Sequence, residues 1–174
     1  MPRQEFARYG PKPRYGTPSA GLCISSFAIV RKGRSLLVGV PRKHPRWVSE
    51  WAPNLAVYDP DELKHEYKSW RLPGTYLKAG EHPDKSIQRV LRQQLDLRRY
   101  KITSSKVYSF HDPSSWYPGR RHWDICFVYD VRTRQIPTRR PWFQSLEFRP
   151  IRSIRGRDFG SAHGDLARKL RLAK

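Results

Sequence analysis

The sequence predicts an α/β domain preceded by a basic tail. Five runs rich in apolar and β-branched residues are typical of strands, namely residues 22–30, 35–40, 101–110, 122–131 and 143–154. One further run, residues 86–97, has the apolar spacing of a helix. At 174 residues, the chain has the length of one domain that buries its own core.

Residues 1–19 form the expected tail. They combine four prolines with basic residues and aromatic rings, so we expect an extended segment that a partner orders. Basic and aromatic residues together suit phosphate contacts and base stacking with RNA. A plain disordered tail would have the same composition.

The first two strands predict a hairpin with a basic tip, because the four residues between them are Arg-Lys-Gly-Arg. Residues 41–69 then form a long connection with four prolines and two tryptophans, which we expect to cover the sheet. Within this stretch, residues 61–70 indicate a short helix.

The helix of residues 86–97 is expected to begin near Pro83, because proline suits the first helical position. Its apolar residues lie at i, i+3, i+4 and i+8 and predict one stripe that faces the core: Ile87, Val90, Leu91 and Leu95. The polar and charged residues between them are expected off that stripe: Arg89, Arg92, Gln93 and Gln94.

The second half of the chain carries basic connections. Residues 114–121 form a loop with two rings and two arginines, in which the rings either stack on bases or fold back onto the core. A basic, proline-containing connection follows the fourth strand, and residues 166–172 predict a closing helix with a basic end.

The net charge points to a polyanionic partner. Thirty-five Lys and Arg residues oppose fifteen Asp and Glu residues, which gives +20. Such a surface attracts nucleic acid and releases counterions when it binds phosphates. The alternative is a surface held by ion-pair networks, and these need both signs of charge. The residues expected to bind RNA are basic or aromatic: Arg3, Arg8, Lys12, Arg14, Arg31, Lys32, Arg34, Trp116, Tyr117, Arg120, Arg121, Arg134, Arg139, Arg140, Arg168, Lys169 and Arg171.

Other chemistry is weakly indicated. Cys23 and Cys126 lie in apolar runs without metal-ligand spacing, which indicates free thiols in a reducing compartment. The six histidines show no ligand pairing. No apolar run approaches the roughly 20 residues of a membrane span, and the N-terminus lacks a signal-peptide core. We therefore expect a cytoplasmic protein with no metal, no cofactor and no membrane contact.

Residues 72–97 resemble the signature of the Nudix hydrolase family, in which a loop and a helix (the Nudix box) hold metal-binding glutamates. Gly74 lies in the usual lead-in, Gly80 and Glu81 match the turn, and Arg89 follows Glu81 after seven residues. The resemblance implies an α/β/α sandwich with a mixed sheet over residues 20–174. It also implies that Arg89 braces the box loop through Glu81.

The same segment departs from the signature at the positions of the metal-binding glutamates. Thr75 and Asp96 replace glycines, while Val90, Gln93 and Gln94 stand where the family has Glu. Family enzymes cleave a diphosphate linked to another group, and they use Mg²⁺ or Mn²⁺, of which Mg²⁺ needs anionic oxygen ligands. A GDP-mannose hydrolase branch also lacks part of the box but keeps a Glu at the position of Gln94. The resemblance therefore implies a degenerate box without catalytic residues, with Val90 packed where the metal would lie.

The missing glutamates and the charge together predict a catalytically inactive RNA-binding protein, a structural component of the ribosome or of another ribonucleoprotein. Its partners would be RNA, above all rRNA, and neighbouring subunits. Two alternatives stay open. One is a divergent hydrolase of a nucleoside-diphosphate sugar or an RNA cap, with a metal held by Glu81, Asp112 and Asp124. The other is a regulator that senses a nucleotide without cleaving it.

Overall fold

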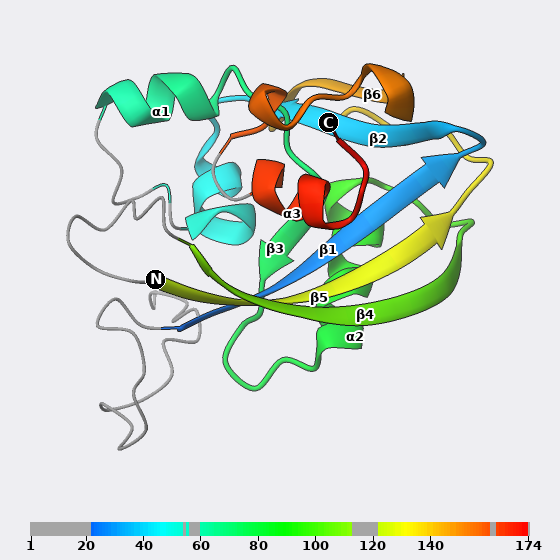
Figure 1. The fold of residues 1–174 in the computed structure, drawn as a ribbon, viewed down its shortest axis with the longest axis horizontal. Coiled ribbons are helices and arrows are strands. Elements are labelled where there is room, and N and C mark those ends of the chain that lie inside the picture. Colours follow the sequence, from blue (N-terminus) through cyan, green and yellow to red (C-terminus); the bar gives the residue numbers. More distant parts are fainter. Residues whose placement is uncertain (1–21, 54, 56–59, 113–121, 161–162, 174) are drawn as a thin grey trace.

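The computed structural model describes residues 22–53, 55, 60–112, 122–160 and 163–173. At its centre lies a mixed sheet of six strands in the order β4-β5-β1-β2-β6, with β3 paired to β1 (Figure 1). β1 and β5 run parallel, and the other pairs are antiparallel. The strands are β1 (Leu22–Lys32), β2 (Ser35–Pro41), β3 (Gly74–Tyr76), β4 (Lys101–Asp112), β5 (His122–Arg132) and β6 (Phe143–Pro150).

The predicted hairpin is confirmed as β1 and β2. Arg31 pairs with Leu36 and Lys32 with Ser35, which leaves a tight turn at Gly33. The φ of Gly33 is +57°, a left-handed conformation that glycine adopts without steric cost. The basic tip predicted from the sequence therefore lies at one end of the sheet, between two strands that are not at its edges.

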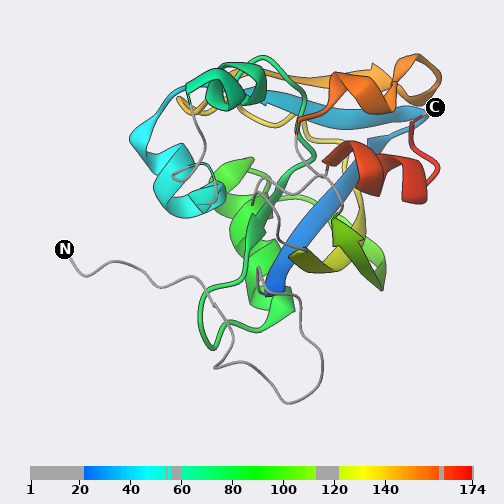
Figure 2. The same cartoon turned by 60° about the vertical axis from the view of Figure 1, so that its left-hand side comes forward.

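Helices cover both faces of the sheet, which confirms the α/β/α sandwich. α2 (Pro83–Arg89) continues as the π-helix η3 (Val90–Gln94) and packs on one face with the π-helix η1 (Trp47–Trp51). α3 (His163–Lys169) packs on the other face. Figure 2 shows η1 and α2 on one side of β1 and α3 on the opposite side.

Three predicted boundaries change. α1 spans Pro60–Glu66, so the short helix ends before residue 70. β6 ends at Pro150 and is followed by the short 3-10 helices η4 (Ile151–Ser153) and η5 (Gly156–Asp158). α3 begins at His163 rather than at residue 166 and ends at Lys169, because Arg171 turns the backbone into the left-handed region with φ 54°.

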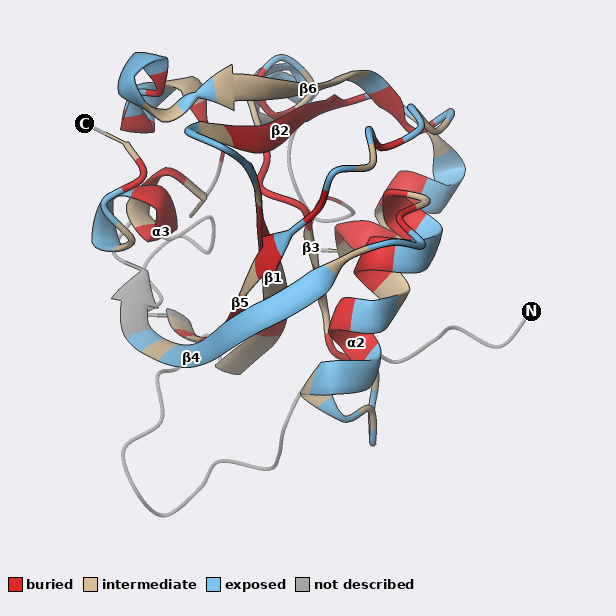
Figure 3. Cartoon of the chain, turned by 90° about the vertical axis from the view of Figure 1, so that its right-hand side faces the viewer, coloured by how far each residue is buried: buried red, intermediate tan, exposed pale blue. Residues whose placement is uncertain are grey.

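The edge strand β4 projects away from the core. Residues 101–107 are all exposed (Figure 3). Val107, which shares its face of the strand with Ser105 and Ser109, is 61% exposed. Cys23 and Cys126 are both free thiols, as expected. Among the described residues, no helix combines the length and apolarity needed to cross a bilayer.

Candidate functional site

An ion pair between Glu81 and Arg89 closes the box loop onto the box helix. The Arg89 Nε donates to Glu81 Oε1 at 2.9 Å, and Nη2 donates to Oε2 at 2.8 Å. The backbone N–H of Lys78 also donates to Oε2, at 2.9 Å. The expected brace between Glu81 and Arg89 is therefore confirmed, and both carboxylate oxygens are occupied by it.

The same guanidinium also holds two other segments. Its Nη2 donates to the carbonyl of Tyr76 at 3.1 Å, and its Nη1 lies 3.4 Å from both Thr75 Oγ1 and the carbonyl of Glu50. The Thr75 hydroxyl donates to that Glu50 carbonyl at 3.0 Å. The Arg89 guanidinium also lies 5.6 Å from the ring centre of Trp51. The end of η1 is therefore tied to the box loop.

The backbone of the box keeps its turns although two glycines are replaced. Gly80 has φ +72°, and Asp96, which stands at a glycine position of the signature, has φ 54°. Aspartate visits this left-handed region more readily than most residues. At the other end, Pro83 lies in the first helical turn as predicted, and His82 caps the helix by accepting the N–H of Asp84 on Nδ1.

The three positions where the family has glutamate differ in their surroundings. Val90 is fully buried among the core residues, as expected, and Gln93 is exposed. Gln94 is fully buried, so the expectation that it lies off the apolar stripe is wrong. The spacing explains this burial, because Gln94 lies four residues after Val90 and seven after Ile87, on the same face of the helix. At this turn, Leu95 donates to the carbonyl of Val90, five residues back, as in a π-helix.

Buried Gln94 binds the box loop directly. Its Nε2 donates to the Gly74 carbonyl at 2.9 Å, and its Oε1 accepts the Gly74 N–H at 3.2 Å. Both polar atoms of the amide are thus paired, as burial requires. A glutamate at this position would have no proton for the Gly74 carbonyl at neutral pH.

Of the carboxylates proposed for a displaced metal site, the structure describes the side chains of Glu81 and Asp124. Glu81 is engaged by Arg89, and Asp124 is a buried residue of β5 with 8% exposure. Asp112 ends β4, and its side chain lies outside the described residues. Within the described part of the chain, no three His, Cys, Asp or Glu side chains gather where a metal ion could bind. The described carboxylates therefore do not fit the divalent ion that the resemblance implies.

A small cavity beside the box loop contains Asp124 and Cys126 and is walled by Trp47 and Trp51. Burial raises the pKa of the Cys126 thiol to about 12, although Ser25 donates a hydrogen bond to its sulfur at 3.3 Å. The thiol is therefore protonated at neutral pH and is a poor nucleophile. The cavity volume is about 50 Å³, far below the roughly 300 Å³ of small-molecule sites. A nucleotide does not fit here beside the two tryptophans.

Among the residues predicted to bind RNA, the structure describes three groups. They lie at the β1–β2 turn, in the connection from β5 to β6, and at the end of α3. Arg31 pairs with Asp130, Arg168 with Asp165 and Arg140 with Asp96. The remaining residues that were predicted to bind RNA lie outside the described residues: Arg3, Arg8, Lys12, Arg14, Trp116, Tyr117, Arg120 and Arg121.

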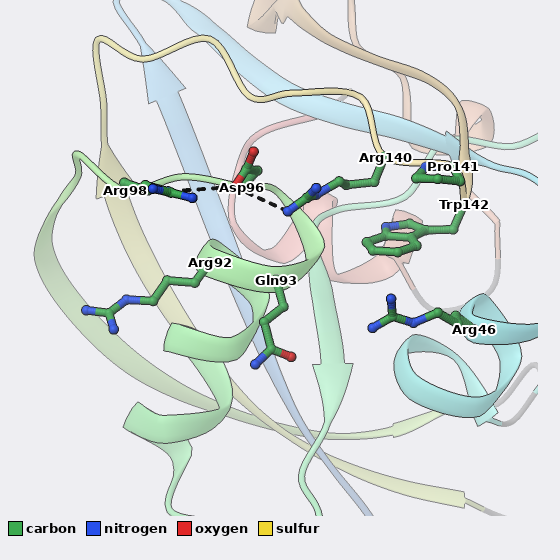
Figure 4. A pocket seen from close by; sticks show the side chains of 8 residues that line it. All are labelled: Arg46, Arg92, Gln93, Asp96, Arg98, Arg140, Pro141 and Trp142. Atoms are coloured by element: carbon green, nitrogen blue, oxygen red, sulfur yellow. Dashed lines mark ion pairs between the residues drawn. The ribbon is translucent and has the colours of Figure 1, made fainter.

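A larger groove, of about 720 Å³, lies at the end of the box helix (Figure 4). Of the four arginines that line this groove, only Arg140 was predicted to bind RNA. Arg46, Arg92 and Arg98 were not. The cluster of basic residues around Asp96 in the sequence was the available signal. It does not reveal that Arg46, about fifty residues earlier, joins the same groove.

We expect Gln94→Ala to lower the free energy of unfolding by about 2 to 4 kcal/mol, because the Gly74 N–H and carbonyl lose their partner in a buried site. Gln93→Ala, at an exposed neighbour, should change it by less than about 0.5 kcal/mol. Urea unfolding followed by circular dichroism measures both. Equal effects of the two variants would show that the Gln94 contact does not hold the loop.

We expect the stabilisation by Glu81 to depend on pH. Burial alone would raise its pKa, but the hydrogen bonds and charges of Arg89 and Lys78 outweigh burial and hold the pKa below its ordinary value of 4.5. The ionised group therefore stabilises the fold above about pH 4.5, and this contribution is lost as the pH falls through the folded-state pKa.

Glu81→Gln should accordingly cost about 1 to 3 kcal/mol at pH 7, and the difference from the unchanged protein should shrink below pH 4. Urea unfolding at several pH values measures this dependence. Asp61→Asn, at a side chain that is 88% exposed, is the control and should cost less than about 0.5 kcal/mol. A constant difference for Glu81→Gln across pH would contradict the role of the ionised carboxylate.

No family model matches the sequence, and no curated protein matches it either. Solved structures do match the fold. The MutT protein from Methanosarcina mazei has a TM-score of 0.58 at 12% identity, over 86% of this chain and 93% of that one. The NUDIX domain of Shewanella oneidensis NrtR, solved with ADP ribose, has a TM-score of 0.52 at 12% identity, over 90% and 92%. The MutT NUDIX hydrolase from Burkholderia pseudomallei has a TM-score of 0.50 at 11% identity, over 75% and 84%.

These likenesses correct one prediction. The missing box glutamates predict a protein that is not an enzyme, and that prediction is wrong: the solved structures that share the fold include Nudix hydrolases, and nothing in the described residues shows that activity is lost. At 11 to 14% identity, the likeness extends to the fold alone. The sheet order, the braced box loop and these matches together show that the chain has the fold of the Nudix hydrolases.

Proposed function

We propose that the chain is a divergent Nudix hydrolase whose substrate contains a nucleoside diphosphate, joined to a sugar or to the end of an RNA. The observation that carries the proposal is the intact brace from Glu81 to Arg89, which holds the box loop in place. The left-handed backbone of Asp96 supports it, because this conformation occurs where the Nudix signature has glycine. One structure with this fold was solved with ADP ribose, a ligand of the proposed class.

The side chains of the protein contribute to hydrolysis by neutralising the charge of the diphosphate and by holding it in position. Because the described carboxylates do not fit a divalent ion, no step of this proposal passes through a metal. Guanidinium groups pair with phosphate oxygens through two parallel hydrogen bonds and keep their charge at any physiological pH. Arginines near the box helix therefore neutralise a diphosphate and orient it toward an attacking water.

We expect purified protein to release a nucleoside monophosphate from at least one of three substrates: ADP ribose, a UDP-sugar or a capped RNA. Each reaction is run with Mg²⁺, with Mn²⁺ and with a chelator, and the products are separated by chromatography. Glu81→Gln should lower turnover by about tenfold or more, because the loop that positions the substrate loosens. Asp61→Asn is the matched control and should leave turnover unchanged. Absence of product from all three substrates under every condition would refute the hydrolase.

A second candidate function is RNA binding in a ribosome or another ribonucleoprotein of the cytoplasm. The net charge of +20 favours it, since a small substrate does not require so many cations. Exposed basic side chains at the β1–β2 turn include Lys32 and Arg34, and Arg134 and Arg139 follow β5. Arg31 pairs in register with Arg132, so the turn and the start of this connection are adjacent.

If this candidate is correct, the protein should sediment with ribosomal particles or bound RNA at 50 mM salt. Its affinity for RNA should fall at least tenfold between about 50 and 200 mM salt, because each phosphate contact releases counterions. Gradient fractionation of a cell extract, followed by RNA extraction from the fractions, measures the co-sedimentation. Titration of RNA with the purified protein at the two salt concentrations measures the affinity. Protein that stays at the top of the gradient in low salt would contradict this candidate.

A further inference from the structure

The groove at the end of the box helix is much larger than the cavity beside the box loop. It is formed by three segments that lie far apart in the sequence. The box-helix end contributes Arg92 and Gln93, the residues just before η1 contribute Arg46, and the approach to β6 contributes Arg140 and Trp142. Figure 4 shows the Trp142 ring between Arg140 and Arg46, with Gln93 facing them from the box helix and the Arg92 side chain extending outward on the other side.

The lining is strongly positive. Four arginines and one carboxylate, that of Asp96, line the groove. Asp96 pairs with Arg140 at 3.2 Å and more loosely with Arg98 at 4.0 Å, and Glu50 binds Arg46 at 2.8 Å. Arg92 is exposed and has no carboxylate partner among the described residues. The groove therefore keeps a surplus of positive charge even after its ion pairs are counted.

Two buried donors in the groove lack a hydrogen-bond partner among the described residues. They are the indole N–H of Trp142 and the Nε of Arg140. Trp142 is only 4% exposed, and a buried donor without a partner costs about 1 to 3 kcal/mol. Because Trp142 and Arg140 both line the groove, an acceptor bound there could satisfy these donors.

The size of the groove separates it from the cavity beside the box loop. At about 720 Å³, it falls within the range of ligand sites, whereas the cavity of about 50 Å³ does not. The Trp142 ring is buried, with the Arg46 guanidinium 5.0 Å and the Trp51 ring 5.9 Å from its centre, so Trp142 does not offer a free face to a base. The features that remain for recognition are positive charge and N–H donors, and these select phosphate oxygens.

We infer that this groove, formed by Arg92, Arg98, Arg140, Arg46 and Trp142, binds the phosphate groups of a nucleotide ligand. The inference rests on the proposed function only for the nucleotide nature of that ligand. Its phosphates come either from a free nucleoside diphosphate or from an RNA backbone. In both cases, Arg92 and Arg140 contact phosphate oxygens from opposite sides, and the indole N–H donates to one of them.

The test compares binding of pyrophosphate, ADP and a single-stranded oligouridine to the full chain without added metal, by calorimetry and fluorescence anisotropy. Arg92→Ala/Arg140→Ala should weaken binding of the preferred probe by about tenfold or more. The control is Arg152→Ala/Arg157→Ala, which removes the same two charges at exposed sites outside the groove lining. This control should weaken binding less than about threefold. Trp142→Phe, which keeps the packing ring and removes the N–H, should weaken it several-fold.

The inference is supported if the groove variants lose affinity and the control variant does not, whichever probe binds. Tight binding of ADP identifies a free nucleotide as the ligand, and tight binding of oligouridine alone identifies RNA. Arg92→Ala by itself, at an exposed side chain, keeps the test valid if the double variant folds poorly. Equal losses in the groove and control variants, or no binding of any probe, would overturn the inference. Because no step requires turnover, selective loss of binding in a protein that hydrolyses nothing would refute the hydrolase and leave the groove standing.

Discussion

The arrangement of the box depends on the guanidinium of Arg89. It binds both carboxylate oxygens of Glu81 and also reaches the Tyr76 carbonyl, the Thr75 hydroxyl and the Glu50 carbonyl. A planar group with donors in fixed directions is suited to hold several acceptors at once. The box loop, the box helix and η1 therefore meet at one side chain, and the positions of the neighbouring residues follow from it.

Next to the ion pair of Glu81 and Arg89, the chain has neutral side chains at two positions where the Nudix signature has glutamate. Val90 packs in the core, and Gln94 joins the helix to Gly74 through two hydrogen bonds. A neutral amide can donate to one backbone atom and accept from another, which a carboxylate cannot do at neutral pH. The loop is thus held to the helix by the protein alone, and no described cluster of carboxylates faces it.

The packing around the box helix also determines where arginines line an open groove. Because Trp47 and Trp51 fill the space between η1 and the sheet, the cavity beside the box loop stays small. The open space lies instead at the far end of the box helix, where arginines from three segments line it. The groove that we propose to bind phosphates therefore lies beside the same helix that Glu81 and Arg89 join to the box loop.

The sequence by itself determined the α/β class, most of the strands, the apolar stripe of Ile87, Val90 and Leu91, and the pairing of Glu81 with Arg89. The strands and the stripe depend on local spacing, since periodicity reports which side of an element is apolar. The pairing of Glu81 with Arg89 was implied by the resemblance of the segment to the Nudix box. Only the tertiary structure decided the rest. The tertiary structure paired buried Gln94 with Gly74, left Val107 of β4 in solvent, and joined Arg46 to Arg92 and Arg140 in one groove. Local patterns do not record which distant segments pack together, because that choice depends on the free energy of the whole core.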